Sequence, residues 1–233
     1  MIKRQIPNLI TLCNLACGVL SVFAALALHY PTQAALLICI GILFDFFDGL
    51  SARLLGVASP MGKELDSLAD VVTSGVAPAA ILFRLTYHPM VDMGIPWLGI
   101  VFLLIPLFAA YRLAKFNLDT RQSHSFLGLP VPSQALVWVG LALSQCLMVD
   151  GQWSVVAIVA LSLVLDVLMV SELPLFGLKF NFKDMSWKTN TVQYLFLIVC
   201  AVIIALLRDW IAISVIILWY IVLSAITQKK HAE

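Results

Sequence analysis

Charged side chains are scarce in this chain of 233 residues: Asp, Glu, Lys and Arg together make up 12% of it. Soluble globular domains carry about a quarter charged residues and about half apolar ones. Here 62% of the residues are hydrophobic and the mean hydropathy is +1.01, so the polar groups needed for a water-facing surface are missing. The composition excludes an ordinary soluble globule and a disordered chain, and it predicts an integral membrane protein.

An excess of positive charge is also missing, and so is any metal-type spacing of cysteine or histidine. The 14 Lys and Arg residues and 13 Asp and Glu residues leave a net charge of +1, which gives no basic surface for a nucleic acid. The five cysteines all lie in apolar runs. These absences exclude a nucleic-acid partner, a disulfide-rich secreted domain and a zinc site, and the cysteines are interpreted as small packing residues.

Long apolar runs, by contrast, occur along the whole chain. A membrane-spanning helix needs about 20 mostly apolar residues. By this rule the sequence predicts an all-α, polytopic membrane protein with about eight transmembrane helices, separated by turn signals such as His88-Pro89. The predicted spans are residues 9–29, 33–55, 67–86, 95–116, 132–149, 153–170, 191–207 and 210–227. No repeat or linker divides the chain, so residues 1–233 are predicted to form a single domain.

The distribution of Lys and Arg predicts how these spans are oriented. If both termini are cytoplasmic, 12 of the 14 Lys and Arg residues lie on the cytoplasmic side, and only Arg84 and Arg208 lie near the other side. Cytoplasmic loops of membrane proteins are enriched in positive charge, which favours this orientation. We therefore expect a multi-pass protein of the cell inner membrane, in contact with membrane lipids and with both termini in the cytoplasm.

Four of the 13 acidic residues fall within 26 residues, on two predicted helices joined by one short cytoplasmic loop. Asp45 and Asp48 share one face of the second span, and Asp66 and Asp70 share one face of the third. Acids in a span are costly and are therefore functional candidates. Four carboxylates turned toward one point at the cytoplasmic membrane interface cannot all stay ionised unaided, and hard cations such as Mg²⁺, Mn²⁺ or Ca²⁺ would neutralise them.

Small residues and one arginine accompany these acids. Gly49, Ala52 and Gly62 have little or no side chain, so a ligand could approach the backbone there. Arg53 adds a fixed cation suited to phosphate. Together these residues favour a site for a phosphorylated ligand. The alternative is simple helix packing with the acids paired to Arg53 and Lys63, which leaves two of the four acids without a cation.

The order of these residues resembles the signature of the CDP-alcohol phosphotransferase family, D-x-x-D-G-x-x-A-R, a spacer, and G-x-x-x-D-x-x-x-D. Every fixed position of this signature is present in Asp45-Phe46-Phe47-Asp48-Gly49-Leu50-Ser51-Ala52-Arg53 and in Gly62-Lys63-Glu64-Leu65-Asp66-Ser67-Leu68-Ala69-Asp70. The resemblance implies an enzyme that joins a CDP-linked lipid or small alcohol to a second alcohol and releases CMP. This chemistry requires no covalent enzyme intermediate and the sequence shows no nucleophile motif that would supply one, so we predict a single displacement.

The same resemblance implies roles for the four acids. Asp45 and Asp66 would bridge two divalent cations, Mg²⁺ or Mn²⁺. Asp48 would complete the first metal site and Asp70 the second. Asp70 would also be the catalytic general base that accepts the proton of the incoming hydroxyl. The active site is accordingly expected at the cytoplasmic membrane interface.

Four further stretches, residues 7–18, 65–78, 112–117 and 126–132, resemble the bacterial phosphatidylserine synthases of this family. The departure is Thr73-Ser74, where many of these enzymes carry Ser-Phe. The branch implies CDP-diacylglycerol as donor, L-serine as acceptor and a homodimer. The residues predicted to contact the CDP-lipid are Asn8, Thr11, Gly49, Ala52, Arg53, Ser59 and Gly62.

The acceptor is less well defined by the sequence. Arg112, Lys115 and Asn117 lie at the cytoplasmic end of the fourth span, where they could bind a serine carboxylate or simply anchor the helix. Glycerol 3-phosphate or an inositol phosphate could be the acceptor in the same chemistry. A divalent-cation transporter is an alternative of another class, because acids in spans also mark ion pathways. The four acids lie at one membrane face, which argues against a path across it.

Overall fold

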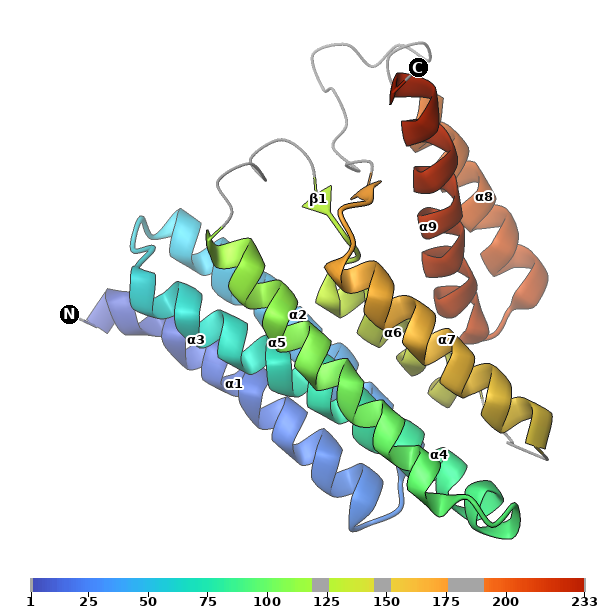
Figure 1. Ribbon diagram of the computed structural model, residues 1–233. Helices are drawn as coiled ribbons and strands as arrows, with labels where there is room; N and C mark the ends of the chain where they lie inside the picture. The colour runs from blue at the N-terminus through green and yellow to red at the C-terminus, as the bar shows by residue number, and fades with distance from the viewer. Residues whose placement is uncertain (1, 119–125, 145–151, 176–190, 233) are drawn as a thin grey trace.

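The computed structural model describes residues 2–118, 126–144, 152–175 and 191–232 (Figure 1). In chain order the elements are α1 (Ile2–Leu26), α2 (Pro31–Leu54), α3 (Pro60–Asp70), η1 (Val71–Val76), α4 (Ala77–Asp92), η2 (Pro96–Leu103), α5 (Leu104–Leu118), β1 (Phe126–Leu127), α6 (Val131–Leu143), α7 (Gln152–Val170), β2 (Pro174–Leu175), α8 (Thr191–Leu207) and α9 (Ile211–Ala232). The segment η1 is a π-helix and η2 is a 3-10 helix. Within the described ranges, β structure is confined to the two-residue strands β1 and β2, so the predicted all-α class is confirmed.

Five helical stretches are long and apolar enough to cross a membrane: Gln5–Leu26, Pro31–Leu54, Pro60–Asp92, Pro96–Leu118 and Trp153–Val170. Three shorter apolar helices cover Val131–Leu143, Gln193–Leu207 and Ile211–Thr227. Each predicted span overlaps one of these stretches, although their ends differ. A polytopic membrane protein is therefore confirmed, while eight crossings stay a prediction, and residues 145–149 of the fifth predicted span lie outside the described residues.

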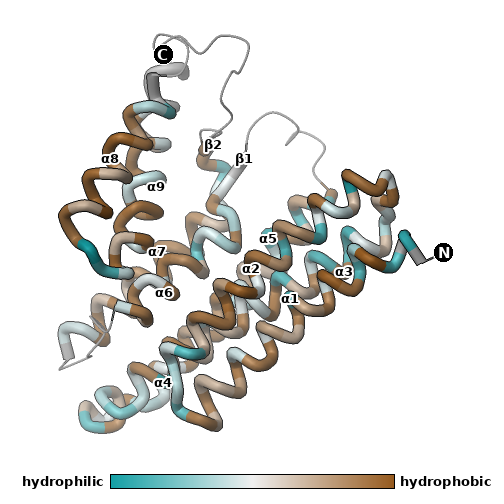
Figure 2. The backbone as a smooth tube through the Cα atoms, turned by 180° about the vertical axis from the view of Figure 1, so that it is seen from behind, coloured by the Kyte–Doolittle hydropathy of each residue, from teal (hydrophilic) through white to brown (hydrophobic). Residues whose placement is uncertain are grey.

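The helix ends and turns gather at two opposite ends of the bundle (Figure 1), and which end faces the cytoplasm stays a prediction. Figure 1 shows the start of α1, the α2–α3 turn and the ends of α5 and α7 toward one end, and the α1–α2 and α4–η2 turns toward the other. In Figure 2 hydrophobic residues run along most of the helices, and hydrophilic segments gather near their ends. Many large apolar side chains, such as Leu20, Leu107 and Leu206, are exposed, as expected for helices that face lipid.

The first predicted span begins too late. The sequence rule places its start at residue 9, whereas α1 begins at Ile2 and passes through Pro7. Hydropathy detects only the apolar part of a helix, and the polar residues before it, Lys3 and Gln5, extend α1 beyond that part. The extension has a consequence for the site, because it places Asn8, which the predicted span left out, within α1.

The third predicted span, residues 67–86, is too short at both ends. A continuous helical stretch runs from Pro60 to Asp92. Ser59 caps the start of this stretch, because its hydroxyl accepts a hydrogen bond from the Gly62 amide at 3.1 Å. Pro60 follows in the first turn, where its missing amide hydrogen costs no hydrogen bond. The break predicted at His88-Pro89 is wrong: α4 continues through Pro89, and the Met93 amide closes the last turn on the Pro89 carbonyl at 3.0 Å.

The core consists of two clusters that meet at α6. One cluster joins α1, α2, α4 and α6 through residues such as Ala25, Ala35, Ile81 and Val139. The other includes Trp138 of α6 and joins it to α5, α7 and α9. Buried hydroxyls link the helices: Ser21 donates to the Ala34 carbonyl and Ser214 to the Val137 carbonyl, both at 2.7 Å. Small residues and hydrogen bonds of this kind hold helices together where water supplies no hydrophobic driving force.

Replacing Gly140 by alanine is expected to destabilise the contact between α6 and α9. A Cβ atom at this position would lie 2.8 Å from the Ser214 amide nitrogen and 3.0 Å from the Trp210 carbonyl oxygen. Both atoms belong to the backbone and cannot rotate away, so the helices must separate at a cost of about 1–3 kcal/mol. Thermal unfolding of the purified variant in detergent would show a lowered midpoint. An unchanged midpoint would show that this close approach does not contribute to stability.

Candidate active site

Two neighbouring helices position the acids. Helix α2 ends at Leu54, and a short turn that includes Gly56, with φ of +62°, leads to the start of α3 at Pro60. A residue without a side chain is favoured at such a positive φ. Helices α2 and α3 run in opposite directions from this turn and both pack against α1, so the end of α2 and the start of α3 lie at the same end of the bundle (Figure 1). Asp45 and Asp48 are thereby brought close to Asp66.

Three of the four predicted metal ligands form one group. Asp45, Asp48 and Asp66 each offer a carboxylate oxygen, and these oxygens lie within 4.8 Å of one another. The Asp45 and Asp66 side chains are within hydrogen-bonding reach of each other. The buried Oδ2 atom of Asp48 has no partner. An oxygen-only group with an unpartnered buried carboxylate oxygen fits a hard divalent cation.

Asp70 lies beside this group but is not one of its three members. Its carboxylate is buried, with 8% of the residue exposed. It interacts electrostatically with Asp66, and its Oδ1 atom accepts a hydrogen bond from Asn14 Nδ2 at 3.4 Å. Asp70 therefore has surroundings of its own, next to the three clustered carboxylates.

Protein cations do not neutralise the clustered acids. Arg53 donates its Nε hydrogen to the Gly49 carbonyl at 2.9 Å, and Lys63 donates to the Asn117 carbonyl at 3.2 Å. Among the described residues the structure records one ion pair, between Lys115 and Glu172. The alternative in which the acids are simply paired with Arg53 and Lys63 is therefore not what the structure contains, and the negative charge of the group is left for a ligand.

A cavity of about 250 Å³ opens next to the acids. It is lined by Pro7, Asn8, Thr11, Asp48, Gly49, Ala52, Arg53, Val57, Ala58, Ser59, Gly62, Lys63 and Asp66. All seven residues predicted to contact the CDP-lipid are among them. Pro7, Val57, Ala58 and Lys63 also line the cavity and were not predicted, because none of them occupies a fixed position of the signature. Pockets that enclose a drug-sized ligand measure about 300–1,000 Å³, so this cavity can hold one part of a larger ligand.

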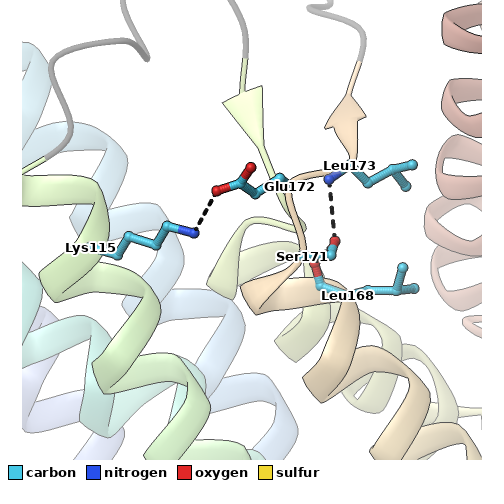
Figure 3. A network of polar contacts seen from close by, with 5 residues as sticks. All are labelled: Lys115, Leu168, Ser171, Glu172 and Leu173. Carbon is cyan, nitrogen blue, oxygen red and sulfur yellow. Dashed lines mark hydrogen bonds and ion pairs between the residues drawn. The ribbon is translucent and has the colours of Figure 1, made fainter.

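The three candidate acceptor residues occupy different surroundings. Arg112 is buried near Asp70, its guanidinium carbon lies 5.9 Å from the centre of the Phe116 ring, and its Nε atom has no partner. Lys115 instead forms the ion pair with Glu172 at 3.3 Å, shown in Figure 3 beside the contact between the Leu173 amide and the Ser171 hydroxyl. Of the two cations, Arg112 is the one that interacts electrostatically with Asp70.

Asn117 connects α5 to α3. Its Nδ2 atom donates to the Ser67 hydroxyl at 2.9 Å, while its backbone carbonyl accepts from Lys63. Asn117 therefore fixes the end of α5 against the helix that carries Asp66 and Asp70. Asn14 was not predicted to belong to the site. A polar amide within an apolar predicted span is a sequence signal that could have indicated it, and the structure shows that this amide is fully buried.

Comparison with known proteins gives a consistent result. The sequence profile of the CDP-alcohol phosphatidyltransferase family matches residues 4–167. A Bacillus subtilis (strain 168) relative is 37% identical over 140 residues, covering 60% of this chain and 76% of the relative. A Helicobacter pylori (strain ATCC 700392 / 26695) relative is 32% identical over 191 residues, covering 78% and 74%. A Saccharomyces cerevisiae relative is 36% identical over 157 residues, covering 61% and 55%. Each of the three is named CDP-diacylglycerol–serine O-phosphatidyltransferase.

Proposed function

Because the chain belongs to the CDP-alcohol phosphatidyltransferase family, we propose that it is a CDP-diacylglycerol–serine O-phosphatidyltransferase of phospholipid biosynthesis. It transfers the phosphatidyl group of CDP-diacylglycerol to L-serine, giving phosphatidylserine and CMP. The observation that carries the chemistry is the group formed by Asp45, Asp48 and Asp66, which forms no ion pair with a protein cation and borders the cavity lined by Asn8, Thr11 and Arg53. The names of the similar proteins support serine as the acceptor.

The cavity is suited to the CDP group of the donor. Asn8 and Thr11 of α1 line one side, and Arg53 lines the side formed by α2. Only the Nε hydrogen of Arg53 is used by the Gly49 carbonyl, so its terminal nitrogens can donate to a phosphate. Ser59 and Gly62 place the amino-terminal end of α3 at the cavity, where the helix dipole favours an anion. The acyl chains stay in the bilayer, between the helices.

The acids are suited to hold the metal ions that the family uses. Asp45, Asp48 and Asp66 would bind them, with Asp70 as a ligand of the second. Two divalent cations, Mg²⁺ or Mn²⁺, would neutralise the pyrophosphate and stabilise the departing CMP when bound. Without cations, three carboxylates this close together would repel the phosphates of the donor.

The chemical step is a single displacement at the lipid-bearing phosphorus. The serine hydroxyl oxygen forms a bond to this phosphorus as the bond to the bridging oxygen breaks, and CMP leaves with that oxygen. Asp70 accepts the hydroxyl proton. Arg112, buried next to Asp70 with an unpartnered Nε atom, binds the carboxylate of serine. Holding both reactants at one place is a major part of such catalysis.

A divalent-cation transporter is a poorer interpretation of the same acids. A transport path requires ligands at successive depths across the membrane. Among the described residues, Asp45, Asp48 and Asp66 make up the one group of acidic, cysteine or histidine side chains that could hold a metal. They lie next to the α2–α3 turn at one end of the bundle, and this placement supports a site at one membrane face.

The proposed function is tested by CMP release from CDP-diacylglycerol by the purified protein in detergent. L-serine, glycerol 3-phosphate and inositol phosphate are compared as acceptors, each with Mg²⁺ or Mn²⁺ and with a chelator. We expect release with serine that is lost on chelation. Release only with a phosphorylated acceptor would overturn the choice of serine and keep the metal chemistry. Absence of release with every acceptor would overturn the proposed enzyme.

Arg53→Ala is expected to weaken binding of the CDP-lipid by about 10- to 100-fold, because a hydrogen bond to a charged group contributes about 1.5–3 kcal/mol. The KM for CDP-diacylglycerol would rise, with a smaller change in kcat. Arg208→Ala is a matched control, since Arg208 is also exposed and also donates Nε to a nearby backbone carbonyl, that of Ala205 in the helix that it follows, at 3.3 Å. Equal effects of the two substitutions, or unchanged binding in Arg53→Ala, would remove Arg53 from the site.

Three further features belong to the proposal. The protein lies in the cell inner membrane with both termini in the cytoplasm, so CDP-diacylglycerol and serine meet at the cytoplasmic interface. Residues 168–233 form one domain with the catalytic part, supported by the packing of α9 on α6 through Ser214. The protein acts as a homodimer, as the family resemblance implies. Accessibility of single cysteines at each terminus, and the mass of the protein in detergent, would test the orientation and the dimer.

A further inference from the structure

A buried polar contact joins α1 to the carboxylate of Asp70. Asn14 is fully buried, and its Nδ2 atom donates to Asp70 Oδ1 at 3.4 Å. This is the hydrogen bond that the structure records for the Asp70 side chain among the described residues. In a region where water does not compete, such a contact determines how the carboxylate is turned.

Asn14 is itself held by the helix that carries Asp70. Thr73 follows Asp70 by three residues, is fully buried in the π-helix η1, and donates its hydroxyl to the Asn14 backbone carbonyl at 3.0 Å. The two contacts run in opposite directions, from α1 to Asp70 and from Thr73 back to α1. Together they fix the distance between Asn14 and Asp70 from both sides.

Two glycines make this arrangement possible. A Cβ atom on Gly18 of α1 would lie 2.5 Å from Thr73 Oγ1, and one on Gly41 of α2 would lie 2.6 Å from Thr73 Cγ2. The Thr73 side chain therefore occupies the space that both glycines leave. A Cβ atom on Gly41 would also lie 2.9 Å from Asn14 Oδ1, so α2 leaves the Asn14 amide little room to rotate.

We propose that Asn14, held by Thr73 between Gly18 and Gly41, is a positioning residue that orients the Asp70 carboxylate toward the acceptor hydroxyl. The proposal rests on the proposed function, in which Asp70 is the general base. Asn14 engages Oδ1 and leaves Oδ2 to face the acceptor. Without the Asn14 amide, the carboxylate is free to turn to other orientations, including those that point away from the acceptor.

The test is Asn14→Leu, which keeps the approximate size of the side chain and removes its donor. We expect kcat to fall by about 10- to 100-fold, as for other residues that orient a ligand or catalytic group. The KM for CDP-diacylglycerol should be unchanged, because Asn14 does not line the cavity. A fall in kcat and kcat/KM by the same factor indicates an interaction that acts only in the transition state. A rise in KM with unchanged kcat would overturn the proposal.

A double mutant separates positioning from a general structural effect. If Asn14 acts through Asp70, then Asn14→Leu lowers the residual rate of Asp70→Asn no further, since the two effects are not additive. A loss that adds in full to that of Asp70→Asn would overturn the proposal. The wild-type reaction with serine tests the proposed function separately: if another acceptor supports CMP release, the Asn14 variants are measured with that acceptor.

Two further variants control for folding. Ser21→Ala removes another buried hydrogen bond of α1, to the Ala34 carbonyl, at a place outside the site. It is expected to lower thermal stability without lowering kcat of the folded protein. Thr73→Val removes the hydroxyl that holds Asn14 and keeps the shape that fills the space beside Gly18. Thr73→Val is expected to lower kcat, as Asn14→Leu does. A wild-type kcat in both Asn14→Leu and Thr73→Val would overturn the proposal.

Discussion

Asp70→Asn is expected to lower kcat by about 10²–10⁴-fold, the usual contribution of a general base. Asparagine has nearly the same shape as aspartate but cannot accept the proton of the serine hydroxyl. Binding of CDP-diacylglycerol should be largely retained, because Asp70 lies outside the group of Asp45, Asp48 and Asp66 and does not line the cavity. Turnover is measured as CMP release, and binding is measured separately with the donor lipid in the absence of serine.

Asp92→Asn provides the matched control for this substitution. Asp92 lies at the other end of the same continuous helical stretch, Pro60–Asp92, and is exposed. The same chemical change there should leave turnover unchanged. Normal turnover in Asp70→Asn would contradict its role as the base. Loss of donor binding equal to the loss of turnover would instead make Asp70 chiefly a metal ligand.

Asp66→Asn is expected to abolish metal-dependent activity. Asp66 faces both acids of α2, so its loss removes the charge from the centre of the group. The contribution of a metal ion to charge stabilisation is several kcal/mol, and each 1.36 kcal/mol corresponds to a tenfold change in rate. We therefore expect kcat/KM to fall by about 10³-fold or more.

Direct metal binding distinguishes this result from a folding defect. Mn²⁺ is titrated into the purified protein, and the free ion is followed by electron paramagnetic resonance. Wild-type protein should bind Mn²⁺, whereas Asp66→Asn should bind it weakly at an unchanged thermal stability. Asp92→Asn again serves as the control, with wild-type binding. Undiminished Mn²⁺ binding by Asp66→Asn would show that the ions are held by other residues.

The periodicity of the acids was enough to predict most of the candidate site. Helical spacing placed Asp45 with Asp48 and Asp66 with Asp70, and the short turn between their helices brings the two faces together. The same local spacing could not separate Asp70 from the other three. The distinct surroundings of Asp70 include Asn14, which is 56 residues away in the chain and meets Asp70 only through the packing of α1 against α3.

The sequence rules failed where a local signal has more than one structural outcome. Proline usually ends a helix, yet Pro7 lies inside α1 and Pro89 inside α4. Pro7 is near the start of α1, where few amides have an intrahelical acceptor to lose, and Pro89 is in the last turn of α4, which ends three residues later at Asp92. The cations at the end of α5 were equivalent in the sequence. Only the packing of β2 and its preceding turn near α5 gives Lys115 a partner in Glu172 and leaves Arg112 beside Asp70.

The length of the Pro60–Asp92 stretch bears on the depth at which the proposed reaction would take place. Its 33 residues extend about 50 Å at 1.5 Å per residue, whereas the hydrocarbon core is about 30 Å thick. A centred and upright stretch would project about seven residues at each end, which would place Asp66 at the hydrocarbon boundary and Asp70 one turn deeper. In the proposed orientation the donor lipid reacts without leaving its leaflet. The rate then depends on the mole fraction of CDP-diacylglycerol in the membrane. Diluting CDP-diacylglycerol with inert lipid should slow turnover even when its amount per volume of water is constant.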